Sequence, residues 1–276
     1  MQLNLGSQTL DLSRPLVMGI LNVTADSFSD CGRFLRFDDA RRQAMAMVEA
    51  GADFIDVGGE STRPGAADVP AEVEIDRVVP VIDAVASETG ALISIDTSKA
   101  EVMRAAVAAG ACLINDVYAL RREGALAAAS QLPAAVCLMH MQGTPATMQA
   151  DPVYESLPGD ILDFLSERVA ACEAAGLARD RLLLDPGFGF GKTDQHNLSI
   201  LRSLGDFRGL GLPLLVGLSR KRTLGNLTGR QPDERLAAGL AAAVLAVERG
   251  AHIVRTHDVA ATVDALRVVA ATMADS

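Results

Sequence analysis

Residues 50–60 read AGADFIDVGGE and contain one complete junction between a helix and a strand. Gly51 ends a helical stretch, because glycine readily takes the left-handed conformation that stops a helix. The apolar run 54–57 follows at once; it is too short for a helix and as continuous as a strand buried on both faces. A polar turn over residues 58–60 ends the run. This order of signals predicts a helix followed by a strand of a parallel sheet.

The same cycle recurs along the chain. The helix stop returns as Ala109-Gly110-Ala111, Ala175-Gly176-Leu177 and Arg249-Gly250-Ala251. Eight apolar runs alternate with segments of helical spacing, so we expect one (β/α)8 barrel, of the TIM-barrel class, over residues 1–276. The predicted strands are 16–21, 54–57, 92–95, 112–114, 135–139, 182–184, 213–218 and 252–254. The clearest predicted helices are 39–50, 73–88, 101–109, 160–175 and 233–248.

The N-terminal residues predict one element outside this cycle. Residues 3–5 and 9–12 alternate in polarity on either side of Gly6-Ser7-Gln8. Such a pattern is typical of a β-hairpin, and we expect it to plug the bottom of the barrel.

Length and composition agree with one large α/β domain. The 276 residues give about 34 for each of eight units, which fits a fold of about 250 residues. The balance of 25 basic and 35 acidic residues gives a net charge of −10, which disfavours nucleic acid and anionic membranes as partners. Four cysteines without a C-x-x-C pair predict neither a zinc site nor a disulfide framework. With no signal peptide and no apolar run long enough for a bilayer, we expect a cytoplasmic protein.

Polar side chains follow all eight predicted strands. The carboxyl ends of parallel barrel strands lie on one rim, where active sites of this fold are found. A helix or turn cap explains any one of these residues, but eight together predict a site for a polar small molecule. They are Asn22, residues 58–60, Asp96, Asn115 with Asp116, His140, Asp185, Ser219 with Lys221, and Arg255 with His257.

The residue types narrow the ligand. Asp96 and Asp185 leave apolar strands and need hydrogen-bond donors. A carboxylate accepts two parallel N–H bonds from a guanidine-like edge, which an aminopyrimidinone ring presents. Lys221, Arg255 and His257 follow the last two strands, where this fold often binds phosphate. We therefore expect a pterin-like heterocycle at one end of the site and an anion at the other.

One glycine-rich stretch resembles a nucleotide-binding loop. Residues 186–193 read PGFGFGKT, which is one residue short of the Walker pattern. Pro186 has no N–H to offer a phosphate, and two phenylalanines would crowd a phosphate cradle. We do not expect a nucleoside triphosphate here.

Several blocks resemble dihydropteroate synthase, over nearly the whole chain and in that family's order. They are MGILNVTADSFSD (18–30), DVGGESTRPG (56–65), CLMHMQG (137–143), DPGFGFGK (185–192), GLSRK (217–221) and RTHD (255–258). The family consists of transferases of folate biosynthesis and sulfonamide targets. They join 6-hydroxymethyl-7,8-dihydropterin diphosphate to 4-aminobenzoate and release pyrophosphate. The resemblance implies this activity, small-molecule partners and a homodimer.

The resemblance also implies roles for individual residues. The pterin-binding set is Asp96, Asn115, Met139, Asp185, Phe190, Lys221 and Arg255. The diphosphate-binding set is Asn22, Thr62, Arg63, Arg255 and His257, with Mg²⁺ as the cofactor and Asn22 as its ligand. The aminobenzoate-binding set is Phe28, Thr62, Arg63, Pro64, Ser219 and Lys221. The catalytic set is Asn22, Asp96, Lys221, Arg255 and His257.

Some points remain open at the level of sequence. Ala25 and Cys31 stand where the family usually has Pro and Gly, and Arg222 adds a charge without an assigned purpose. The apolar segment 236–247 fits a buried barrel helix or a dimer face. Methyl transfer from a pterin to a corrinoid protein, or pterin binding without catalysis, are the alternative functions.

Overall fold

The computed structural model describes residues 1–24, 33–61, 68–144 and 147–273. Phe28, Thr62, Arg63 and Pro64, predicted above to bind substrate, lie outside these ranges. Ala25 and Cys31 lie outside them as well.

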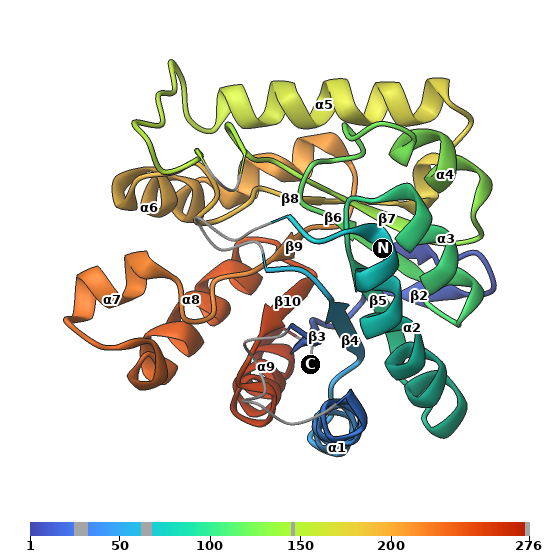
Figure 1. Ribbon diagram of the computed structural model, residues 1–276. Helices are drawn as coiled ribbons and strands as arrows, with labels where there is room; N and C mark the ends of the chain where they lie inside the picture. Colours follow the sequence, from blue (N-terminus) through green and yellow to red (C-terminus); the bar gives the residue numbers. More distant parts are fainter. Residues whose placement is uncertain (25–32, 62–67, 145–146, 274–276) are drawn as a thin grey trace.

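Within the described ranges, eight parallel strands form the centre of the molecule and helices surround them (Figure 1). The strands are β3 (Leu16–Asn22), β4 (Phe54–Gly58), β5 (Leu92–Asp96), β6 (Leu113–Asp116), β7 (Ala135–Met139), β8 (Leu182–Asp185), β9 (Leu215–Val216) and β10 (Ile253–Thr256). They pair in the order β8-β7-β6-β5-β4-β3-β10-β9. The N–H of Leu184 donates to the carbonyl of Pro213 over 2.9 Å, and a parallel bridge joins Leu184 to Leu214, which closes the ring between β8 and β9.

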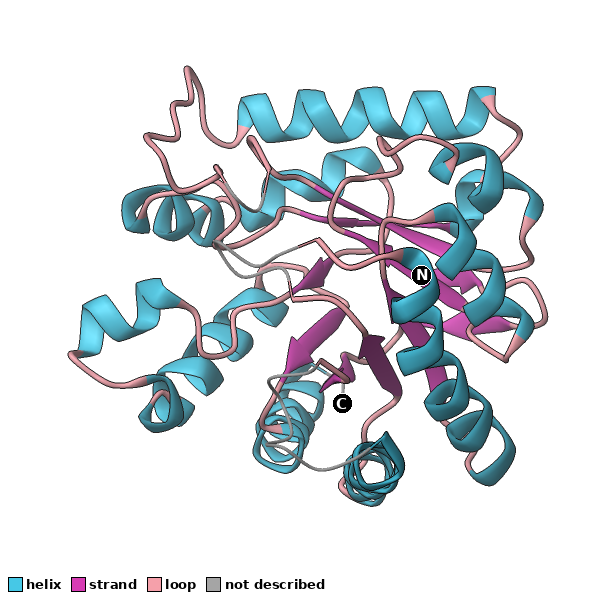
Figure 2. Cartoon of the chain, in the orientation of Figure 1, coloured by secondary structure: helices cyan, strands magenta, loops and turns pink. Residues whose placement is uncertain are grey.

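Every barrel strand is followed by at least one helix (Figure 2). The helices are α1 (Arg33–Glu49), α2 (Ala71–Glu88), α3 (Ala100–Ala108), α4 (Ala125–Gln131), α5 (Gly159–Ala174), α6 (Asp194–Arg202), α7 (Arg222–Thr228), α8 (Leu236–Glu248) and α9 (Val259–Met273). The predicted (β/α)8 barrel is therefore confirmed. In the part of the chain that is described, no helix has both the length and the apolar character needed to cross a membrane.

The predicted ends of helices and strands are confirmed where a local sequence signal, such as a glycine, determines them. The helix-stop glycines Gly51, Gly110, Gly176 and Gly250 all have positive φ angles, of 93°, 118°, 87° and 106°. The strand predicted over 213–218 is ladder-paired only at Leu215–Val216, because Pro213 lacks an N–H and Gly217 adds no side chain to the sheet. The helix predicted from residue 233 starts at Leu236, after a short 3-10 turn at Pro232–Glu234.

The side chains of each strand point alternately into two apolar cores, one between the sheet and the helices and one inside the barrel. One set, which includes Val17, Ile55 and Ile114, packs outward with apolar residues of the helices. The other set points into the barrel and forms a separate apolar cluster that includes Phe54 and Leu113. Two residues further along the strands, the inward positions become polar, as at Asp56, Asn115, Asp185 and Arg255. The barrel thus has an apolar floor and a polar mouth.

The N-terminal hairpin completes this floor. Its strands β1 (Gln2–Asn4) and β2 (Thr9–Asp11) pair antiparallel, one residue from the predicted positions. Leu3 and Leu5 are fully buried in the same cluster as Phe54 and Leu113. Gly6 turns the chain at a φ of 88°, and a Cβ at this position would lie 2.1 Å from the carbonyl oxygen of Pro133. The predicted plug is confirmed.

Leu3→Ala should therefore behave as a core substitution, although Leu3 is only the third residue of the sequence. Removing a fully buried leucine costs about 2–5 kcal/mol of unfolding free energy. Urea denaturation of the purified chain measures this loss. Val268→Ala, at a 65% exposed position, is the control and should change the value by less than about 0.5 kcal/mol. Equal effects for the two variants would show that the hairpin is not part of the core.

Candidate active site

The side chain of Arg255 lies between two carboxylates in the mouth of the barrel. Its Nε donates to Oδ2 of Asp56 over 2.5 Å, and a terminal nitrogen donates to Oδ2 of Asp96 over 2.8 Å. Asn115 Nδ2 donates to the same Oδ2 of Asp56 over 3.2 Å. The cluster joins the ends of β4, β5, β6 and β10, and it brings together three residues that the sequence predicted for the pterin.

Asp56 belongs to this cluster but is missing from the sequence-based site. It is fully buried, and its Oδ1 has no hydrogen-bond partner among the described residues. A signal was present: an ionisable side chain inside the apolar run 54–57 needs a partner when the strand is buried. The buried, unpartnered oxygen makes Asp56 a candidate ligand-binding residue.

Burial sets the protonation of Asp96 and Arg255. Loss of solvent raises the pKa of Asp96 to about 7; the charge of Arg255 opposes this shift and that of Asp56 adds to it. Burial disfavours the charge of Arg255 as well, but Asp56 and Asp96 together raise its pKa above the ordinary value. Asp96 therefore titrates near neutral pH beside a guanidinium that stays charged.

Asp185, which is buried, and Lys221, which is partly buried, are two further charges in the barrel mouth. The N–H of Gly187 donates to Oδ1 of Asp185 over 2.7 Å, yet burial still raises the pKa of Asp185 to about 6. Burial, and then the charge of Arg255, lowers the pKa of Lys221 to about 8. Both groups are ionised between these values, so near pH 7 the mouth offers an acceptor at Asp185 and a cationic donor at Lys221.

An apolar wall stands beside these charges. Met139 packs in one cluster with Val117, Met141 and Met148, and Phe190 lies against that cluster. The ammonium of Lys221 lies 4.2 Å from the centroid of the Phe190 ring, a distance at which a cation is attracted to the ring face. Met139 and Phe190, predicted to pack beside a heterocycle, are thus brought together next to Lys221.

Ser219, two residues before Lys221, contacts His257. The Oγ of Ser219 lies 3.0 Å from Nδ1 of His257 and accepts the backbone N–H of His257 over 3.2 Å. Burial, and then the charges of Arg220 and Arg255, lowers the pKa of His257 to about 4. At neutral pH, His257 is therefore an uncharged hydrogen-bonding group.

Asn22 ends β3 opposite Gly58, the last residue of β4. A Cβ on Gly58 would lie 3.7 Å from Oδ1 of Asn22 and 3.8 Å from Oδ2 of Asp96. The missing side chain thus leaves space between an amide oxygen and a carboxylate. The described ranges contain no group of three or more His, Cys, Asp or Glu that could hold a metal. A divalent ion near Asn22 would therefore take most of its oxygens from substrate and water, as Mg²⁺ often does.

The Walker-like stretch has a different use. Lys192 is almost fully buried, and its amine contacts Nδ1 of His140 over 2.9 Å and the carbonyl of Phe190 over 3.0 Å. Gly187, at a φ of 72°, lies so close to the loop after β7 that a Cβ would come within 1.9 Å of the carbonyl oxygen of His140. The glycines let two neighbouring loops pack together, and Lys192 links these loops instead of facing a phosphate.

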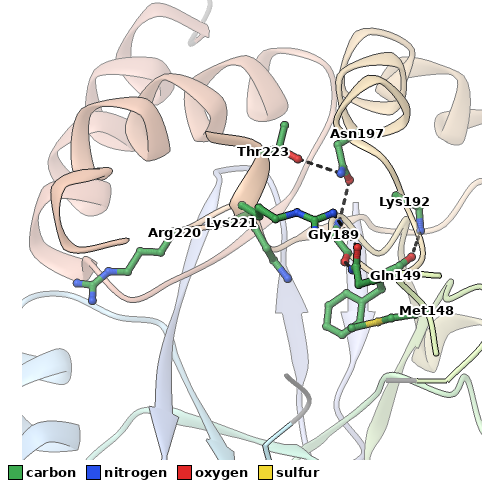
Figure 3. A pocket seen from close by; sticks show the side chains of 10 residues that line it. Met148, Gln149, Gly189, Lys192, Asn197, Arg220, Lys221 and Thr223 are labelled. Carbon is green, nitrogen blue, oxygen red and sulfur yellow. Dashed lines mark hydrogen bonds between the residues drawn. The ribbon is translucent and has the colours of Figure 1, made fainter. Parts of the chain in front are cut away.

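A cavity of about 330 Å³ opens beside Lys221. Figure 3 shows that its side chains come from the segments around Gln149 and Gly189, from Asn197, and from the start of α7 at Lys221 and Thr223. The described lining contains four basic side chains and no carboxylate. The lining residues are Met148, Gln149, Gly189, Phe190, Lys192, Asn197, Arg220, Lys221, Arg222 and Thr223.

Comparison with known proteins shows the family to which the chain belongs. The family model described as "Pterin binding enzyme" matches residues 18–257. The dihydropteroate synthase of Escherichia coli K12 is 54% identical over 96% of this chain and 94% of its own length. That of Haemophilus influenzae is 49% identical over 99% of both chains.

Solved structures show the same relationship. The Yersinia pestis dihydropteroate synthase in a sulfonamide drug complex has a TM-score of 0.94 and 51% identity, covering 99% of both chains. The Xanthomonas albilineans enzyme in complex with 7,8-dihydropteroate has a TM-score of 0.89 and 45% identity, covering 100% of this chain and 99% of that one. The protein is therefore a transferase, and the chain belongs to the dihydropteroate synthase family of pterin-binding enzymes.

Proposed function

We propose that the barrel mouth joins 6-hydroxymethyl-7,8-dihydropterin diphosphate to 4-aminobenzoate, giving 7,8-dihydropteroate and pyrophosphate. One observation supports this most strongly. The carboxylates of Asp96 and Asp185 stand at the ends of their strands, beside an apolar wall and a cavity lined by basic side chains, in a chain that matches dihydropteroate synthases over nearly its whole length. No observation favours methyl transfer or binding without catalysis.

The pterin ring would bind in the barrel mouth, where Asp96, Asn115 and Asp185 offer hydrogen-bond acceptors. Oδ1 of Asp185 already accepts a hydrogen bond from the N–H of Gly187, so Oδ2 is left to accept one from an N–H of the ring. Asn115 offers both an amide donor and an amide acceptor, and Asp96 offers a second carboxylate. Met139 and Phe190 would pack beside the ring, with Lys221 and Arg255 at its edge.

The diphosphate would bind on the side of Asn22 and His257. The amide oxygen of Asn22 and the unpartnered Oδ1 of Asp56 are hard oxygen donors, which fit a Mg²⁺ ion. When bound, this ion would neutralise charge on the diphosphate. His257 would donate a hydrogen bond to the leaving group. Thr62 and Arg63 remain predicted partners of the diphosphate, as Phe28, Thr62, Arg63 and Pro64 remain predicted partners of 4-aminobenzoate.

The reaction would proceed by departure of pyrophosphate before attack. The bond between the pterin methylene carbon and the diphosphate oxygen breaks, and its electron pair leaves with pyrophosphate. The electron-rich dihydropterin and the buried carboxylates stabilise the cation that results. The arylamine nitrogen then uses its lone pair to form the new C–N bond, and its proton passes to solvent.

We also infer a homodimer and a cytoplasmic location. The exposed stripe of α8 is apolar at Ala237, Ala241 and Leu245, four residues apart, and a second copy of the chain would cover it. Cys112, Cys137 and Cys172 are free thiols, which suits a reducing compartment. The Yersinia pestis complex supports sulfonamide binding in this site as well.

The direct test is product formation by the purified chain with pterin diphosphate and Mg²⁺, with and without 4-aminobenzoate. Dihydropteroate should form only with all components. Asp185→Asn should abolish it, because the amide turns an N–H towards the N–H of the pterin ring where the carboxylate offers an oxygen. One charge-assisted hydrogen bond is lost and a ring N–H is left facing a donor, so calorimetry should show pterin diphosphate affinity falling about a hundredfold.

Asp264→Asn, at an exposed position on α9, is the matched control and should bind as the wild type does. Unchanged affinity in Asp185→Asn would contradict the assignment of Asp185. Absence of 4-aminobenzoate-dependent product in the wild type would contradict the proposed function.

The pH dependence follows from the buried charges. Asp185 and Asp96 act as charged hydrogen-bond acceptors for the ring N–H groups only when they are ionised. We therefore expect kcat/KM for pterin diphosphate to rise from below pH 6 to about pH 7. Lys221 donates only when protonated, so kcat/KM should fall above about pH 8. Lys221→Arg should remove the fall, because a guanidinium stays charged there. A flat profile from pH 5 to 9 in the wild type would exclude these roles.

The dimer is tested by adding charge to the exposed stripe of α8. The double substitution Ala241→Glu with Leu245→Glu should halve the mass measured by light scattering. Val73→Glu, at an exposed apolar position on α2, should leave the mass unchanged. A wild-type mass of one chain at all concentrations would disprove the homodimer.

A further inference from the structure

A second cavity, of about 500 Å³, lies at the end of the barrel opposite the mouth. Its lining comes from segments that precede strands: residues 12–15 before β3, Leu212 before β9 and residues 250–252 before β10. Val247 at the end of α8 and Met273 at the end of α9 line it as well. The proposed active site lies at the opposite ends of the same strands, so this cavity is separate from it.

The described lining contains two arginines and no carboxylate. Arg14 is already paired, because a terminal nitrogen donates to Oδ2 of Asp53 over 3.2 Å and this contact raises the pKa of Arg14. Arg208 is exposed and has neither an ion pair nor a side-chain hydrogen bond within the described ranges. The guanidinium of Arg208 is therefore available to an anion.

A glycine makes room for Arg208 at the cavity wall. A Cβ on Gly250 would lie 2.3 Å from Nε of Arg208 and 3.0 Å from a terminal nitrogen. The backbone at Gly250 has a φ of 106°, which a larger residue rarely adopts. The guanidinium thus lies against the turn between α8 and β10, two residues before His252.

His252 offers a second hydrogen-bond donor to the cavity. The N–H of Leu214 donates to Nδ1 of His252 over 3.1 Å. Burial, and then the charges of the Met1 amine and of Arg208, lowers the pKa of His252, so the ring is uncharged at neutral pH. Since Nδ1 accepts, the ring proton lies on Nε2. Within the described ranges this Nε2–H has no hydrogen-bond partner.

The rest of the wall is aliphatic. Leu12, Leu212, Val247, Ala251 and Met273 contribute to it, and the described lining holds no Phe, Tyr or Trp. A volume of about 500 Å³ falls among those of small-molecule sites. A flexible alkyl chain can follow such a wall, and methionine adapts its shape to it. An inorganic anion would gain nothing from this surface, and a neutral lipid would leave the two donors unused.

We propose that this cavity binds a medium-chain aliphatic carboxylate, which Arg208 and His252 hold by its charged end. The guanidinium and the Nε2–H would both donate to the carboxylate, and charge-assisted hydrogen bonds of this kind are strong. The occupant would contact the chain after the N-terminal hairpin, the 3-10 segment Leu204–Leu210, the start of β10 and the end of α9. Binding would therefore join parts of the chain that are far apart in sequence and stabilise the closed barrel.

Calorimetry and thermal unfolding of the full chain with octanoate test this proposal. One octanoate should bind each chain with a Kd on the order of 0.1 mM, since so small a ligand has few atoms to bury. Tm should rise with octanoate concentration, because the ligand binds only the folded chain. 1-Octanol has the same chain without a charge and should bind at least about tenfold more weakly. Acetate, which lacks the chain, should not bind at these concentrations.

Three variants isolate the two donors. Arg208→Met keeps the stem and removes the charge. His252→Asn keeps an acceptor for the N–H of Leu214 and removes the Nε2–H. Each should weaken octanoate binding about tenfold or more and leave 1-octanol within about twofold. Arg202→Met removes the same charge from an exposed position on α6 outside the cavity, and it should match the wild type.

The same titrations can overturn the proposal. A wild-type chain that binds no octanoate up to about 5 mM would do so, as would equal affinity for 1-octanol. Octanoate binding that Lys221→Met removes and Arg208→Met leaves unchanged would place octanoate in the barrel mouth. Binding that appears only after deletion of residues 274–276 would assign the cavity to this segment of the chain itself.

These measurements need neither substrate nor product. An inactive wild type that still binds octanoate would contradict the proposed function and leave this inference standing. An active wild type without octanoate binding would do the reverse.

Discussion

The barrel mouth depends on the ion pairs made by the partly buried guanidinium of Arg255. The guanidinium contacts Asp56 and Asp96, and without it two carboxylates would be buried with no opposing charge between them. Burying one unpaired charge costs several kcal/mol, so this arrangement is stable only as a set. The set also leaves an excess of negative charge, which keeps the mouth ready for a ligand that brings hydrogen-bond donors.

The floor of the barrel makes this concentration of charge possible. Leu3, Leu5, Phe54 and Leu113 exclude water below the charged layer, so stability comes from one end of the barrel and chemistry from the other. Above the floor, close packing of loops fixes the wall. Gly187 allows the loops after β7 and β8 to touch, and Lys192 ties them together beneath Phe190. The apolar wall beside Lys221 is therefore held rigidly.

The sequence predicts the barrel well because its signals are local. A glycine such as Gly51 stops a helix through its own φ angle, and a run such as 54–57 is buried whichever strand lies next to it. The bounds of the short β9 were harder to predict, since they depend on how Pro213 and Gly217 meet the neighbouring strands. For the site, strand ends predicted Asp96, Asn115, Asp185 and Arg255. Asp56 was missed because it lies within β4 and does not follow the end of the strand, and its partner Arg255 is 199 residues away.

The last strand has a consequence for how the molecule is made. β10 pairs with β3 and β9, supplies Ile253 to the floor beside the hairpin leucines, and supplies Arg255 to the mouth. A ribosome releases this strand after the hairpin and after every other barrel strand. Sheet closure, completion of the inner core and neutralisation of the buried carboxylates must then occur together, across most of the length of the chain. A chain that lacks β10 can complete neither the inner core nor the charged cluster of the mouth. The folded barrel and its active site therefore form together.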